Sequence, residues 1–65
     1  MKVIPSLFAE IKSFAEDLHV VAIEGQRLDN APDMQRVLTS QLRMTMAAMR
    51  GKVGEIKCLL GDAHD

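Results

Sequence analysis

Two rows of charged residues, each spaced by seven, are the groups in this chain whose types and spacing could do chemistry. The acidic row is Glu10, Asp17 and Glu24, and the basic row is Arg36, Arg43, Arg50 and Lys57. Because residues seven apart lie along one edge of a helix, each row presents a line of single sign. A line of cations could follow the phosphates of a nucleic acid or pair with the carboxylates of a neighbouring helix.

Other reactive side chains are scattered. Cys58 has no nearby His that would activate its thiol, and we expect it to be a small buried residue. His19 has no companion at ligand spacing, so a surface position is expected. Asp62, His64 and Asp65 are chelating groups in a short tail. We therefore predict that the protein is not an enzyme and has no catalytic residue, cofactor or metal site.

Length and composition favour assembly. A core built from 65 residues rarely supplies more than roughly 3–5 kcal/mol without a disulfide, a metal or an oligomer. The single cysteine cannot form an internal disulfide, which leaves oligomerisation as the usual route. The N-terminal residues do not resemble a signal peptide, and no apolar run approaches the roughly 18 residues of a membrane span. We expect a cytoplasmic protein that does not enter the membrane.

The helices that must position the charged rows can be read from apolar spacing. Steps of three and four predict a helix over about 5–26, with a seam formed by Ile4, Leu7, Ile11, Phe14, Leu18 and Val21. A turn follows at about 27–31, with Asn30 or Asp29 as the expected N-cap of a second helix over about 32–60. Gly61 should end that helix before the tail at 61–65. The fold class is an all-α, antiparallel two-helix hairpin in one domain.

The second helix carries two apolar seams. The main seam is Leu42, Met46, Met49, Val53, Ile56 and Leu60, and a second, on nearly the opposite face, is Met34, Val37, Met44, Ala48, Gly51 and Cys58. A helix with two apolar stripes favours a second helical partner. Gly51 and Gly54 indicate either a close approach of another backbone or a break in the helix. The predicted interface residues are Leu42, Met44, Met46, Met49, Val53, Ile56, Gly51 and Ala48.

The charged rows flank these seams. The acidic row falls at heptad position g of the first helix and the basic row at position e of the second. Since g faces e between parallel coiled-coil helices, we expect the acidic edge to meet the basic edge of another subunit. The alternative is that the basic row remains free to bind nucleic acid. No interleaved aromatic residues are present to stack on single-stranded bases.

In length and layout the chain resembles Rop-type plasmid copy-number regulators, which are small hairpins that dimerise into four-helix bundles and bind RNA. It is also similar in layout to two-helix secretion chaperones. Neither resemblance rests on a shared motif, so no residue role is carried over. We predict a four-helix or larger bundle, with a dimer favoured, that acts as a helical interaction protein for a helical partner. The alternatives are a dimeric nucleic-acid-binding regulator and a purely structural oligomer.

Overall fold

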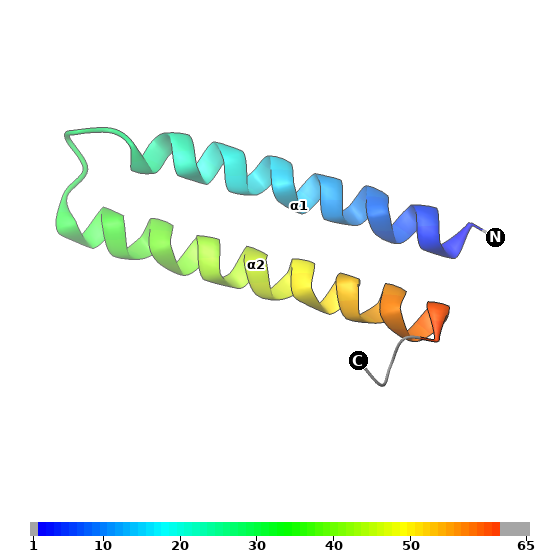
Figure 1. The fold of residues 1–65 in the computed structure, drawn as a ribbon. Helices are drawn as coiled ribbons and strands as arrows, with labels where there is room; N and C mark the ends of the chain where they lie inside the picture. The colour runs from blue at the N-terminus through cyan, green and yellow to red at the C-terminus, as the bar shows by residue number, and fades with distance from the viewer. Residues whose placement is uncertain (1, 62–65) are drawn as a thin grey trace.

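The chain folds into two long helices joined by a short turn (Figure 1). The computed structural model describes residues 2–61, so the predicted tail groups Asp62, His64 and Asp65 lie outside the described residues. Helix α1 spans Val3–Gly25 and helix α2 spans Pro32–Leu60. The Cα atoms extend over 46 × 22 × 12 Å. The hairpin is therefore a single layer, and both of its broad faces are open.

The ends of the helices follow local chemistry. Helix α1 begins two residues before the expected start at Pro5. Helix α2 has Pro32 in its first turn, where the missing N–H costs nothing, and Asp33 near its positive end. It ends as predicted at Gly61, whose φ of 82° is the left-handed conformation that glycine adopts without strain. No break occurs at Gly51 or Gly54, since α2 is continuous through both.

The predicted cap of α2 is wrong. The N-cap is Ala31, which makes no side-chain hydrogen bond, and Asp29 instead pairs with Arg27 at 3.1 Å. The Asn30 amide turns the other way and donates a 2.7 Å hydrogen bond from Nδ2 to the carbonyl oxygen of Glu24. That carbonyl belongs to the last turn of α1, where four acceptors lack helical partners. Asn30 therefore closes the first helix rather than opening the second.

The helices meet along one seam. The residues of α1 in this seam are those that the spacing predicted. The buried or half-buried side chains of α1 are Ile4, Leu7, Ile11, Phe14, Leu18 and Val21. From α2 the buried or half-buried residues are Leu38, Leu42, Thr45, Ala48, Met49, Lys52 and Ile56. Within residues 2–61 the only buried side chains are those of Leu7 and Ile56, which are exposed by 5% and 7%. The hairpin has a strip of contacts, without an enclosed core.

The predicted main seam of α2 is half correct. Leu42, Met49 and Ile56 face α1, but Met46, Val53 and Leu60 are 58%, 45% and 60% exposed. The apolar stripe of α2 is wider than one neighbouring helix can cover, so one flank of it stays open. The seam instead uses the other flank, where Thr45 and Lys52 are half-buried and the Lys52 amine reaches Glu10 of α1 at 3.2 Å.

Candidate functional site

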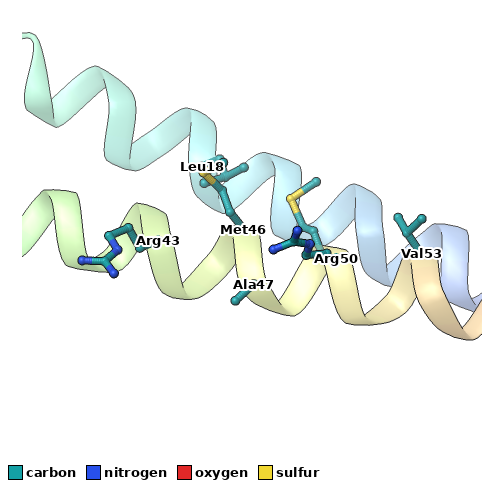
Figure 2. Close-up of a pocket in the computed structure, with 7 residues that line it drawn as sticks. Leu18, Arg43, Met46, Ala47, Arg50 and Val53 are labelled. Carbon is teal, nitrogen blue, oxygen red and sulfur yellow. The ribbon is translucent and has the colours of Figure 1, made fainter.

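An apolar groove runs along one broad face of the hairpin. It has a volume of about 560 Å³ and is lined by Leu18, Arg43, Met46, Ala47, Met49, Arg50 and Val53. Figure 2 shows Leu18 of α1 and Met46 of α2 meeting at the groove, with Arg43 and Arg50 along α2 beside it. The groove is therefore an apolar surface with a cationic margin.

The same face extends along α1. Phe8 is 58% exposed, and Ala15 and Ala22 follow it at intervals of seven, on the same edge of the helix. In an antiparallel pair the e edges of both helices lie on the same side of the seam. Phe8, Ala15 and Ala22 occupy heptad position e of α1, so this edge lies beside Met46 and Val53 of α2. We call this side, with the basic row, the basic face.

Among residues 2–61, part of the basic row makes no ion pair. Arg36 pairs with Asp33 of its own helix at 2.8 Å. Within residues 2–61, however, Arg43, Arg50 and Lys57 have no carboxylate within 4.0 Å. Two of these three cations line the groove. Their charges are thus available to a molecule that docks on the basic face.

The acidic row lies on the other broad face, which we call the acidic face. Glu10 pairs across the seam with Lys52 at 3.2 Å, and Lys52 also contacts Glu55 of its own helix at 3.5 Å. The hydrogen bond and the charge of Glu10, followed by the charge of Glu55, raise the pKa of Lys52 above its ordinary value of 10.5. Glu24 contacts Arg27 at 3.6 Å. Asp17 makes no ion pair among the described residues.

Other predicted interface residues divide between the two sides of α2. Leu42, Met49 and Ile56 are used within the hairpin, so they support the faces rather than form them. Met44 and Val37 are 73% and 49% exposed on the side of the acidic face, whereas Ala48, which was predicted for the same second seam, is half-buried in the seam with α1. A Cβ placed on Gly51 or Gly54 would meet nothing within 4 Å, so neither glycine serves a close approach inside the hairpin.

Some of the surface was not predicted as interface. Phe8, Ala15, Ala22 and Leu18 complete the basic face from α1, and their spacing by seven was the signal that could have identified the first three. Lys52 was not expected in the seam at all. Its neighbour Glu55 and the distant Glu10 become its partners only once the two helices are aligned.

The remaining candidate side chains, Cys58 and His19, lie outside the apolar parts of the two faces. Cys58 is exposed, so the expected burial of this residue is wrong; it lies on the outer side of α2, where α1 does not reach. His19 is exposed, as predicted. Within residues 2–61, no three His, Cys, Asp or Glu side chains are grouped to hold a metal ion. Neither helix, over the part of the chain described, is both long and apolar enough to cross a membrane.

The fold and this surface define a two-helix hairpin with one basic and one acidic apolar face. Comparison with protein-family models, with curated proteins and with solved structures gave no significant match.

Proposed function

We propose that this chain is a non-enzymatic helical interaction protein that self-associates through the broad faces of its hairpin into a larger bundle. The observation that carries the proposal is the imbalance of burial. Among the described residues two side chains, Leu7 and Ile56, are buried, whereas large apolar residues 45–73% exposed lie on both faces. A lone hairpin of this kind has few contacts to offset the entropy of ordering its chain.

The position of the exposed residues supports the same proposal. Met46 and Val53 line one groove together with Leu18 and Met49, rather than standing as isolated surface residues, and Phe8 is 58% exposed on the same side of α1. Contiguous apolar surface on a small protein is typical of an interaction site. Methionine side chains are flexible and adapt to the shape of a neighbouring helix. Arg43 and Arg50, which line the groove, would orient the docked helix.

A matched pair of alanine substitutions tests this proposal. Ala15 lies on the basic face, whereas Ala9 of the same helix lies on the outer side of α1, away from α2 and from both faces. Sedimentation velocity over a concentration series should show that wild type and Ala9→Glu associate. Ala15→Glu should associate much more weakly, while circular dichroism shows the same helix content. A wild-type protein that remains monomeric throughout the series would overturn the proposal.

Nucleic-acid binding is a second candidate function, favoured by one observation. Arg43, Arg50 and Lys57 form an exposed line without ion pairs among residues 2–61, as a phosphate-binding row requires. Titration with RNA and DNA at rising salt would measure it, because each phosphate contact contributes to the salt dependence. Binding that Arg43→Gln and Arg50→Gln abolish would support this second function. Binding that these changes leave intact would exclude the row as its site.

A further inference from the structure

The two charged rows lie on opposite faces of one hairpin, so they cannot pair within a chain. Glu10 reaches Lys52 on one side of the seam, while Arg43 and Arg50 line the groove on the other side. We propose that copies of this protein stack face to back, with the basic face of one copy on the acidic face of the next. The inference rests on the proposed self-association and specifies its geometry.

Charge argues against the simpler two-fold dimer. A two-fold contact brings the same surface of both copies together. Pairing two basic faces would place Arg43 and Arg50 near the same cations or near Lys12 of the neighbour, and pairing two acidic faces would bring carboxylates together. Like charges brought together while losing water are destabilising. A face-to-back contact instead sets each row against its opposite.

The register of the hairpin allows the rows to match along their length. The Glu10–Lys52 pair shows that residues of α1 and α2 lie level when their numbers add to 62, which puts the central residue of α1, Phe14, beside Ala48. Suppose that the next copy is rotated by 180° about the normal to the plane of the hairpin. Its α1 then runs parallel to α2 of the first copy, and each α1 residue lies level with the α2 residue whose number is higher by 34. The pairs Glu10–Arg43, Asp17–Arg50 and Glu24–Lys57 share an offset of 33. All three pairs can therefore form at once, within about one residue of the centred position.

The same placement brings apolar surfaces together. The e edge of α1 in one copy then lies over α2 of the next, so that Phe8 falls beside Gln41 and within one helical turn of Met44, and Ala15 falls beside Ala48 and within one turn of Gly51. Met44 is 73% exposed in the single chain, and a Cβ on Gly51 would meet nothing. Ala15 and Gly51 are small enough for the two helices to approach closely. This contact gives the second apolar seam of α2 an occupant, a second copy of this chain.

Assembly by this contact does not close on itself. Each copy uses its basic face once and its acidic face once, and every step is a half-turn with a translation along the stack. A contact between different surfaces that does not close generates open assemblies. The mean mass should therefore rise steadily with concentration and fall at high salt, because the paired rows lie near solvent.

Asp17 and Arg50 provide the test, since neither has an ion-pair partner within residues 2–61. Asp17→Arg and Arg50→Glu should each place like charges in the contact and weaken association by about tenfold or more. The double variant restores opposite charges and should recover wild-type association. An equimolar mixture of the two single variants should also assemble, because alternating copies then present opposite charges at every contact.

The other outcomes separate this geometry from the underlying self-association. A two-fold dimer through the basic faces would be strengthened by Arg50→Glu and unaffected by Asp17→Arg. That result, or a double variant that stays as weak as the singles, would overturn face-to-back stacking while leaving self-association intact. A monomeric wild type would overturn both proposals. Circular dichroism of each variant confirms that the hairpin is still folded when its mass is measured.

Discussion

Replacing two glycines of α2 with alanine should change stability in opposite directions. Gly54 lies inside the helix on its outer side, and an added Cβ would meet nothing within 4 Å. Gly54→Ala should therefore raise the free energy of unfolding by about 1 kcal/mol, which is the difference in helix propensity. Gly61 has the same open surroundings but a φ of 82°. Gly61→Ala should lower the free energy of unfolding by roughly 1–2 kcal/mol, because an L-residue is strained there.

Urea unfolding followed by circular dichroism measures both changes. All variants must be compared at one protein concentration, because self-association contributes to apparent stability. In a thermal scan, 1 kcal/mol corresponds to a shift of about 4–8 °C for a domain of this size. A Gly54→Ala variant no more stable than wild type would refute the continuous, uncovered helix at that position. An unchanged Gly61→Ala variant would refute the left-handed helix end.

Three further predictions concern the seam and the turn. Leu7→Ala should lower the free energy of unfolding by about 2–5 kcal/mol, which is enough to unfold most of the protein. Val20 is 61% exposed, so Val20→Ala should change the free energy of unfolding by less than about 0.5 kcal/mol in the same urea experiment. Asn30→Ala removes the hydrogen bond to Glu24 and should cost about 1 kcal/mol, with Gln41→Ala as an exposed control; equal stability of the two variants would contradict the capping role. Because Glu10 raises the pKa of Lys52, the stabilising contribution of Lys52 is fully present below pH 10.5 and is lost as the pH rises through the raised pKa. The difference in free energy of unfolding between wild type and Lys52→Met should therefore shrink in alkaline solution. A difference that does not depend on pH would contradict this prediction.

The buried side of the first helix could be predicted closely, although Phe8, Ala15 and Ala22 widen its apolar stripe toward the basic face. Ile4, Leu7, Ile11, Phe14, Leu18 and Val21 match the width that one neighbouring helix covers, so spacing alone identifies the buried side. The stripe of α2 is wider, and either flank of the Leu42, Met49 and Ile56 row could have faced α1. The flank containing Thr45 and Lys52 does so, a choice that depends on the Glu10–Lys52 pair and is not visible in either helix alone.

The candidate surface could likewise be predicted from the sequence only in part. The spacing by seven correctly identifies two charged rows, but it does not say on which faces of a hairpin they lie. That depends on how each helix is rotated about its own axis, which follows from seam contacts between residues distant in the sequence. The predicted N-cap of α2 was wrong for a related reason. Asn30 is close in the sequence both to the start of α2, which it could cap, and to the end of α1, which it could also cap. The path of the turn directs its side-chain amide to the carbonyl oxygen of Glu24 at the end of α1.

The mass of the protein in solution tests the central claim most directly. Sedimentation equilibrium of the wild-type chain should show a mean mass above that of the 7.2 kDa monomer, rising with concentration and falling at high salt. A single 7.2 kDa species at every concentration would contradict the claim that the open faces of this hairpin exist to bind further copies of it.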